Sequence, residues 1–374
     1  MSADVHVDRL ARVRAAMVEH HVDSLLVSVG PDLPWLTGYE AMPLERLTML
    51  VVPAGDQPTL VVPRIEAPRV VDRPDVFTIR PWDEAEDPVD IVARLVGAAD
   101  CVAVGDRTWA RFVIDLQHVL PRRHWRKGSL VTGPLRAVKD FAEIQQLRAA
   151  ASAADRVAAQ LQDGEIPLVG RTEAAISADI GARLLAEGHH RVNFAIVAAG
   201  ANAASPHHEP SDRVVAAGEV VLCDFGGTLL GPDGAGYCSD ITRCVWTGGK
   251  APAAEFAELY AVLHEAQAAG VAAATVGTTC EAVDAAARSV IAAAGRGAEF
   301  IHRTGHGIGI EEHEDPYIVE GNDTRLVPGH AFSVEPGIYV DGRWGARLED
   351  IVVATEAGPE ALNTADHDLV VVDC

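Results

Sequence analysis

Five residues that prefer water or a cation stand inside or beside apolar, strand-like runs in the C-terminal part of the chain. Asp224 ends the predicted strand in VVLCDFGG, Asp240 precedes ITRCVW, and His306 lies between glycines in TGHGIG. Glu335 interrupts FSVEPGIY, and Glu349 stands in ARLEDIVV, where Arg347 offers a simple partner. Taken alone, Asp224, Asp240 and His306 each fit a turn, a cap or a loop, whereas Glu335 and Glu349 stand within apolar runs where such a role is harder to assign. Because burying a carboxylate without a partner is costly, the five together favour convergence on one site.

Carboxylates that converge must be neutralised, because like charges at close range repel one another. Two divalent cations would balance four carboxylates. Carboxylate-rich ligation with one histidine suits Mn²⁺ and tolerates Fe²⁺, Co²⁺ or Zn²⁺. Two such ions a few ångströms apart hold a hydroxide at neutral pH and polarise a carbonyl at the same time. The residues therefore predict a site for two divalent ions, with Mn²⁺ expected, and the chemistry of amide hydrolysis.

The charge balance and the N-terminus exclude other classes of protein. The chain has 54 Asp and Glu against 31 Lys and Arg, a net charge of −23, so a nucleic-acid partner is not expected. The start MSADVHVDRLARVRAAM lacks the apolar stretch of a signal peptide, and no apolar run is long enough to span a membrane. Six cysteines occur without a CxxC pair, which is typical of buried thiols in a reducing compartment. We therefore expect a cytoplasmic protein with no membrane partner.

Residues 1–133 alternate helix and strand signals. Leu10, Val13 and Met17 recur at helical spacing, and short apolar runs follow, broken by prolines. The main runs lie at 24–29, 48–53, 76–79, 91–95 and 102–104. This alternation predicts a small α/β domain with a mixed sheet.

Residues 134–374 mix helices with antiparallel-looking strands. Asp140 and Glu143 form a capping-box pattern, which predicts a helix that runs to about Leu161. Further helices are predicted at 172–188, 254–269 and 280–294, the last capped by Gly295, and strands at 194–197, 219–224, 241–246, 331–334 and 351–354. This arrangement fits an α+β domain better than a doubly wound sheet.

The amino-acid sequences of several segments resemble those of a known family. SPHHEPSDR, VVLCDFGG, GYCSDITR, HRTGHGIGIEEHEDP, FSVEPGIYV and GARLEDIVV closely resemble the pita-bread metallopeptidases, which include proline aminopeptidases, prolidases, methionine aminopeptidases and creatinase. LRAVKDFAEIQQLRAA and PWLTGY resemble the two-domain branch of that family. The resemblance implies a creatinase-like N-terminal domain at 1–133 and a pita-bread catalytic domain at 134–374.

The resemblance also implies a ligand set for two metal ions. Asp224 matches the bidentate ligand of one metal, and Asp240 and Glu349 match the two bridging ligands. His306 and Glu335 match the remaining ligands of the second metal. Glu335 also resembles the residue that shuttles a proton beside the bridging water.

Other residues match family positions that do not bind metal. His207 and His313 match the histidines that contact the substrate and the tetrahedral intermediate. Arg347 matches an arginine that lies behind the ligands in the proline-specific branch. His208 and His302 carry weaker matches, and we expect them in loop or surface roles.

All five ligand positions are filled, which argues against creatinase-type chemistry without metal and against non-enzymatic relatives of the same fold. Methionine aminopeptidases usually lack the N-terminal domain. The motifs are most similar to those of Xaa-Pro peptidases, so the expected reaction is hydrolysis of an N-terminal Xaa-Pro bond by a hydroxide between two cations.

An aminopeptidase is slightly favoured over a dipeptidase. A non-peptidase amide hydrolase and a non-catalytic binding protein remain alternatives.

The substrate length and the oligomeric state depend on features that the resemblance leaves open. A prolidase needs a cation for the free carboxylate of proline. Some prolidases place an arginine shortly after the second histidine, where this chain has Tyr317, so Arg325 or Arg343 would have to substitute. The resemblance further implies a homodimer with PWLTGY near the partner's active site. Packing of Trp35 and Tyr39 within their own domain fits those residues equally well.

Overall fold

The computed structural model describes residues 5–373. The chain forms two compact units, of which unit 1 runs to Arg136 and includes Gly231–Gly236, and unit 2 holds Ala137–Leu230 and the chain from Tyr237 onward. Helix α5 (Ser129–Ala137) crosses the limit between residues 133 and 134 that the sequence predicts. The domain boundary between residues 133 and 134 is therefore a proposal. No helix in the described part of the chain is both long and apolar enough to cross a membrane.

Unit 1 is built on a six-stranded mixed sheet in the order β4-β3-β2-β1-β5-β6. Its strands are β1 (Ser24–Ser28), β2 (Met49–Pro53), β3 (Thr59–Pro63), β4 (Thr78–Trp82), β5 (Cys101–Val104) and β6 (His124–Lys127). β1 pairs antiparallel with β2 and parallel with β5, so Leu26 faces Val51 on one side and Val104 on the other. The mixed sheet that the alternating signals predict is confirmed.

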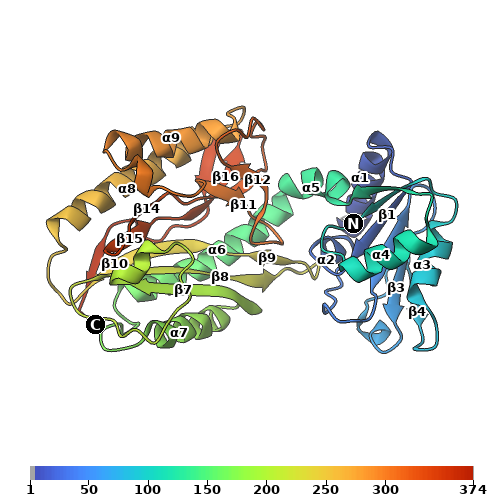
Figure 1. Cartoon of the computed structure of the whole chain (residues 1–374), viewed down its shortest axis with the longest axis horizontal. Helices are drawn as coiled ribbons and strands as arrows, with labels where there is room; N and C mark the ends of the chain where they lie inside the picture. The colour runs from blue at the N-terminus through green and yellow to red at the C-terminus, as the bar shows by residue number, and fades with distance from the viewer. Residues whose placement is uncertain (1–4, 374) are drawn as a thin grey trace. The chain divides into compact units, whose positions relative to one another are not determined.

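Helices cover the sheet of unit 1. They are α1 (Val5–Glu19), α2 (Asp32–Thr37), α3 (Pro88–Val96), α4 (Ala110–Val119) and the start of α5. Asp87 caps α3 by accepting a hydrogen bond from the Val89 N–H, and Pro88 occupies the first turn, where no N–H is needed. α3 and α4 lie side by side against the sheet (Figure 1), and their apolar residues form one core with Leu26, Val51 and Val102. Period-two alternation in the strands supplies that apolar face.

Trp35 and Tyr39 are buried within unit 1, at 0% and 5% exposure. The Trp35 carbonyl accepts a hydrogen bond of 3.0 Å from Nη1 of Arg9, and the Arg9 guanidinium lies 5.4 Å from the indole ring. Arg9 also pairs with Asp233 of the 231–236 segment at 3.0 Å. The PWLTGY segment therefore gives no local support to an interface, because its aromatic residues pack in their own unit.

Unit 2 contains two sheets and a hairpin. One sheet has the order β18-β10-β8-β7 with β9 beside β8, and the other has the order β12-β11-β13-β16-β17. The first sheet comprises β7 (Arg191–Ala199), β8 (Val220–Leu230), β9 (Gly236–Cys238), β10 (Ile241–Thr247) and β18 (Val370–Val372). The second comprises β11 (Gly305–Gly307), β12 (Glu314–Ile318), β13 (Ala331–Val334), β16 (Asp350–Thr355) and β17 (Gly358–Ala361). The hairpin joins β14 (Gly337–Val340) to β15 (Trp344–Arg347).

Four long helices pack on these sheets (Figure 1). They are α6 (Phe141–Gln162), α7 (Glu173–Ala186), α8 (Ala254–Ala273) and α9 (Cys280–Ala293). The predicted capping box is present, since Asp140 accepts from the Glu143 N–H at 2.8 Å and Glu143 accepts from the Asp140 N–H at 2.9 Å. α6 and α7 pack on β7, β8 and β10, whereas α8 and α9 contact the second sheet. The mixture of helices with largely antiparallel strands agrees with the α+β prediction.

One predicted strand end is wrong. The strand that contains Asp224 does not end there, because β8 continues to Leu230 and pairs with β7 as far as Thr228. The glycines after Asp224 suggest a turn, but Gly226 serves close strand contact. A Cβ on Gly226 would lie 2.1 Å from the Ser239 carbonyl oxygen. Asp224 therefore lies in mid-strand, where its neighbours hold it firmly.

Candidate metal centre

Strand alternation decides which way the acidic residues point. In β8, Val221, Cys223 and Phe225 pack in the core beneath α6 and α7. Since successive side chains in a strand point to opposite faces, Asp224 lies on the other face with Leu222. The same alternation in β10 places Ile241 and Val245 in the helix-covered core and leaves the opposite face to Thr242. The first sheet thus presents Asp224 on the face away from α6 and α7.

Thr242 links that face to the second sheet. It stands opposite Asp224 in the β8–β10 pairing, and an isolated bridge joins it to Glu349. Its hydroxyl donates to Oε2 of Glu349 at 2.6 Å. Glu349 directly precedes β16, which follows the hairpin that carries Arg347. The sheet register therefore brings together Asp224 and Glu349, which are far apart in the chain.

His306 and Glu335 reach the site from the second sheet. His306 is the middle residue of β11, between Gly305 and Gly307. A Cβ on Gly305 would lie 1.8 Å from the Ser333 carbonyl oxygen, and one on Gly307 would lie 2.3 Å from that of Asp315. Only glycines allow β12 and β13 to approach so closely on either side of the histidine. Glu335 follows β13, and Oε1 accepts from the Ser333 hydroxyl at 3.1 Å.

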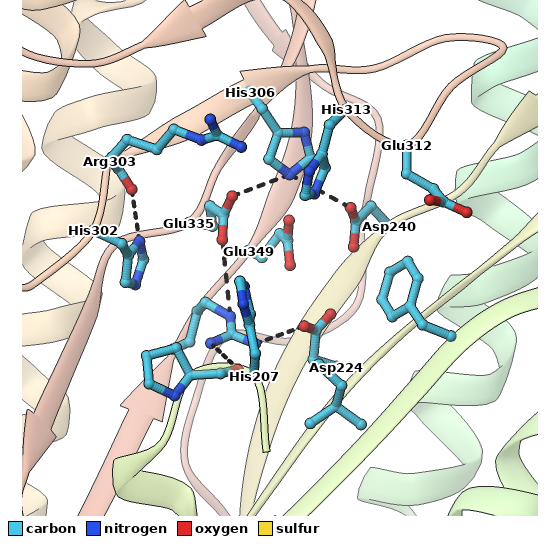
Figure 2. Close-up of a pocket in the computed structure, with 14 residues that line it drawn as sticks. His207, Asp224, Asp240, His302, Arg303, His306, Glu312, His313, Glu335 and Glu349 are labelled. Carbon is cyan, nitrogen blue, oxygen red and sulfur yellow. Dashed lines mark hydrogen bonds and ion pairs between the residues drawn. The ribbon is translucent and has the colours of Figure 1, made fainter. Parts of the chain in front are cut away.

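All five predicted ligands line one cavity of about 430 Å³ (Figure 2). The predicted non-ligand residues His207, His313 and Arg347 line it as well. A cavity of this size suits a small ligand. The remaining lining residues are Phe194, Ile196, Pro206, His302, Arg303 and Glu312.

Three of the five ligand-type residues already stand at ligand spacing. One atom each from Asp240, His306 and Glu349 lie within 4.8 Å of one another. Nε2 of His306 lies 3.1 Å from Oε1 of Glu335 and 3.8 Å from Oδ2 of Asp240. Asp224 does not belong to this group of three, and its Oδ2 accepts a hydrogen bond of 2.6 Å from Nη2 of Arg347. The structure therefore gathers all five residues, and Asp224 and Glu335 also lie close to the Arg347 guanidinium, at 2.6 and 3.9 Å.

Arg347 connects several walls of the cavity. Its side chain is 3% exposed, and Nε donates to the Thr242 hydroxyl at 3.1 Å. Nη1 donates to the Tyr339 hydroxyl at 2.8 Å, and Nε lies 3.9 Å from Oε2 of Glu335. A simple pair with Glu349, the sequence-based alternative, is not formed. Arg347 instead neutralises Asp224, because both face the same interior from adjacent elements.

The carboxyl groups in this cluster oppose one another's ionisation. Burial, followed by the charges of Glu349 and Asp224, raises the pKa of Asp240 well above its ordinary value. Burial and the charges of Glu335 and Asp224 raise the pKa of Glu349 well above its ordinary value. Burial also raises the pKa of Asp224, although Arg347 opposes the shift. For Glu335 burial acts in the same direction, but the hydrogen bond and charge of His306 lower its pKa to about 2.

Two buried carboxylate oxygens without hydrogen-bond partners indicate whether the four carboxylates and the imidazole fit metal ions. Oδ1 of Asp224 and Oδ1 of Asp240 are buried and have no hydrogen-bond partner among the described residues. A buried carboxylate oxygen without a donor carries a desolvation cost that a cation would remove. Four carboxylates and one imidazole are ligands that hard and borderline divalent cations accept. The residues present therefore fit divalent metal ions.

The two predicted histidines that do not bind metal lie at the edge of the cavity. The His313 ring lies 3.9 Å from the His306 ring, centroid to centroid, and its side chain is exposed. His207 follows the short helix η2 (Gly200–Ala204) and is also exposed. Both are placed to meet a ligand rather than the buried carboxylates (Figure 2). His208 instead bonds Glu173 at 2.8 Å, outside the cavity lining.

Sequence reasoning missed part of the cavity wall. His302, expected in a loop or surface role, lines the cavity, and its Nε2 lies 2.9 Å from the Tyr339 hydroxyl. Arg303 and Glu312 line it too, and their closeness to His306 and His313 in HRTGHGIGIEEHE was an available signal. Ile196 lies opposite Asp224 across the β7–β8 pair. That contact depends on register, which no local pattern specifies.

Residues 145–356 match the metallopeptidase family M24, and residues 9–138 match the creatinase/prolidase N-terminal domain. The chain belongs to metallopeptidase family M24. The two matches, in this order, confirm the predicted two-domain metallopeptidase with a creatinase-like N-terminal domain. Membership of this family implies divalent metal ions and metal-dependent peptide hydrolysis, as the five acidic and imidazole ligands predict.

Individual relatives match the chain over nearly its whole length. A Mycobacterium tuberculosis protein described as the probable dipeptidase PepE is 44% identical, over 99% of this chain and 97% of that protein. The Xaa-Pro dipeptidase of Lactobacillus helveticus is 34% identical, over 97% of this chain and 98% of that protein. The crystal structure of recombinant prolidase from Thermococcus sibiricus matches with a TM-score of 0.90 at 32% identity, over 97% of this chain and 98% of that one. The pita-bread fold expected for the catalytic domain is confirmed by this likeness.

Proposed function

We propose that this chain hydrolyses the bond between an N-terminal residue and a following proline, with an Xaa-Pro dipeptide as its main substrate. The observation that carries the proposal is the convergence of Asp224, Asp240, His306, Glu335 and Glu349 on one cavity with two orphaned carboxylate oxygens. The names of two relatives, a probable dipeptidase and an Xaa-Pro dipeptidase, favour the dipeptide over the longer peptide that the sequence slightly favours.

We propose that these five residues hold two divalent ions, with Mn²⁺ as the native metal. Bound divalent ions polarise a carbonyl and lower the pKa of a coordinated water to near neutrality. The protein supplies the rest of the chemistry. The low exposure of Asp240, His306 and Glu349, between 2% and 3%, keeps the carboxylates in a region of reduced dielectric, where charge–charge interactions are strong.

The remaining side chains orient the substrate and move protons. Glu335 lies between His306 and Arg347, so it can accept a proton from a nucleophilic water and pass it to the leaving nitrogen. His207 and His313 stand at the exposed rim, where each can donate a hydrogen bond to the carbonyl oxygen as negative charge develops on it. Arg347 balances the charge of Asp224 from behind. Phe194 and Ile196 offer an apolar wall for a substrate side chain.

A non-catalytic binding protein with the same fold is not favoured. Such a protein would need neither the rim histidines nor Glu335 between His306 and Arg347. A homodimer and a cytoplasmic location remain proposals that rest on the resemblance and the sequence. Sedimentation at micromolar concentration would decide the first, since a monomer with full activity would exclude a dimer requirement.

The test of the proposed function is hydrolysis by purified protein after treatment with chelator and after titration with Mn²⁺, Co²⁺ or Zn²⁺. We expect cleavage of Ala-Pro with added metal only, much slower cleavage of Ala-Ala, and about two ions per chain at saturation by elemental analysis. Cleavage of Ala-Pro-Ala at a higher kcat/KM than Ala-Pro would favour the aminopeptidase. Full activity with one ion per chain, or with chelator present, would overturn the two-metal proposal.

A further inference from the structure

Two arginines line the cavity, and they differ in what their guanidinium groups do. Arg347 is buried and donates to Asp224, Thr242 and Tyr339. Arg303 is partly exposed, and within residues 5–373 its side chain has no carboxylate or hydrogen-bond partner. Arg303 is therefore the guanidinium of the cavity wall that is open to a ligand, as far as the described residues show.

The Arg303 side chain is nevertheless held in place. Its guanidinium carbon lies 4.4 Å from the centroid of the Tyr317 ring in β12, a cation–π distance that orients the planar group. The Arg303 carbonyl lies 2.7 Å from Nδ1 of His302, which anchors the backbone at the same point. A planar guanidinium with a fixed orientation is suited to bind a carboxylate through two parallel hydrogen bonds.

The position of Arg303 in the cavity determines which carboxylate it can reach. Figure 2 shows the guanidinium extending toward His306 and Glu335, while Glu312 lies on the opposite side, beyond Asp240. Arg303 and Glu312 thus lie on either side of the carboxylate cluster, where the peptide bond would be hydrolysed. In an Xaa-Pro dipeptide the free carboxylate follows the scissile nitrogen after a single α-carbon. The carboxylate therefore stays close to the scissile bond, where a cation beside the cluster can bind it.

Because the chain is strongly acidic, an arginine in the cavity without a carboxylate partner suggests that its partner is a ligand. The chain carries 54 acidic against 31 basic Lys and Arg residues. The arginines that the sequence leaves as candidates for the free carboxylate lie outside the cavity lining. Arg325 is exposed and donates to the Gly277 carbonyl, and Arg343 pairs with Glu255 on the surface. Neither is placed to bind a ligand in the cavity.

We propose that Arg303, oriented by Tyr317, binds the free C-terminal carboxylate of the substrate and thereby selects dipeptides over longer peptides. This inference rests on the proposed function, because it names the group that fixes the length of the Xaa-Pro substrate. Arg303 binds and positions the substrate, and it takes no part in proton transfer.

The test compares Ala-Pro with its C-terminal amide, which lacks the negative charge but keeps the same scissile bond. The Mn²⁺-loaded proteins are wild type, Arg303→Gln, Arg303→Lys and, as a matched control, Arg343→Gln. We expect Arg303→Gln to lower kcat/KM for Ala-Pro by roughly 10- to 100-fold, mainly through KM, the scale of a lost charge-assisted hydrogen bond. The amide should change by less than about 3-fold, Arg303→Lys should lose less, and Arg343→Gln should match wild type.

Several outcomes would overturn the proposal. An equal loss on Ala-Pro and on its amide would show that Arg303 does not read the carboxylate. A loss confined to Glu-Pro and its amide would assign the guanidinium to an acidic first side chain instead. If wild type cleaves no Xaa-Pro peptide, the proposed function fails, and calorimetric binding of L-proline and L-prolinamide then decides the role of Arg303. Binding of L-proline that is lost in Arg303→Gln would support it, and no preference for L-proline in wild type would refute it.

Discussion

Arg347 and Asp224 form a buried ion pair between β15 and β8, with Nη2 2.6 Å from Oδ2 and side chains 3% and 11% exposed. Glu349, only two residues from Arg347 in the chain, takes its hydrogen bond from Thr242 instead. The pair places a fixed positive charge behind the acidic cluster. It leaves Oδ1 of Asp224 as an orphaned acceptor in the cavity wall.

Breaking this pair should cost stability. Arg347→Met leaves the Asp224 carboxylate buried without its cation, and we expect the metal-free protein to lose about 3–5 kcal/mol in free energy of unfolding. The double variant Arg347→Met/Asp224→Asn should recover part of that loss, because the uncompensated charge is gone. Urea unfolding in the presence of chelator measures both. Arg343→Met is the control, since the Arg343–Glu255 pair is about half exposed and should contribute little. If Arg347→Met and Arg343→Met lowered the free energy of unfolding equally, the buried Arg347–Asp224 pair would have no special role in stability.

Metal binding should stabilise the fold, and Glu349→Gln should reveal why. The pKa values of Asp240 and Glu349 are raised in the folded state, so their contribution to stability is present at low pH and lost as pH rises. In chelator, Glu349→Gln should therefore gain in melting temperature relative to wild type between pH 5 and pH 8. With excess Mn²⁺, wild type should gain several degrees at pH 7.5 and less at pH 5, where protons compete for the ligands.

The corresponding measurement is a set of thermal melts at both pH values, with chelator and with Mn²⁺. The gain from Mn²⁺ should be smaller for Glu349→Gln than for wild type, because the amide is a poorer ligand. Identical melting temperatures with and without Mn²⁺ at pH 7.5 would mean that these residues do not bind the cation.

Removing the rim histidine should affect the rate and not the metal. His313→Ala is expected to lower kcat for Ala-Pro by roughly 10²-fold, the scale for one lost donor to a developing oxyanion. The metal content should stay at the wild-type value, because the His313 ring packs beside His306 without belonging to the 4.8 Å ligand group. Elemental analysis and steady-state kinetics on the same sample give both numbers. Normal turnover would remove His313 from the mechanism.

A second histidine should make the fold sensitive to acid. Burial, with a smaller effect of Lys139, lowers the pKa of His330 to about 4. Because the folded state binds fewer protons than the unfolded state, stability is lost as pH falls from about 6.5 to about 4. The loss is on the order of 2–3 kcal/mol for a side chain that is 6% exposed.

The variant His330→Asn should show a smaller loss of stability between pH 7 and pH 5 than wild type. Its amide can still accept the hydrogen bond that the Val327 N–H donates to Nδ1 of His330. Urea unfolding at three pH values in chelator gives the comparison. His190→Asn, at an exposed position in the same unit, is the control. A variant with the wild-type pH dependence would show that His330 is not an acid-sensitive group.

Much of unit 2 was predictable because its signals are local. The α6 capping box depends on Asp140 and Glu143, three residues apart, and the start of α7 depends on the Thr172 side chain. Apolar runs predicted β10 and β13 almost to the residue. The strand end at Asp224 was wrong because the glycines after it fit both a turn and a close strand contact. Only the neighbouring backbone distinguishes the two.

The sequence by itself determined which residues carry the chemistry. Carboxylates and a histidine within apolar runs require partners, and the motifs that contain them resemble those of one family. Tertiary structure decided how these residues meet. The sheet register set Thr242 between Asp224 and Glu349, and the approach of β12 and β13 held His306 among the carboxylates. It also left the Arg303 guanidinium open beside Tyr317, while Arg325 and Arg343 lie elsewhere. Such contacts join residues from separate strands, so they follow from strand pairing and packing, which local sequence does not specify.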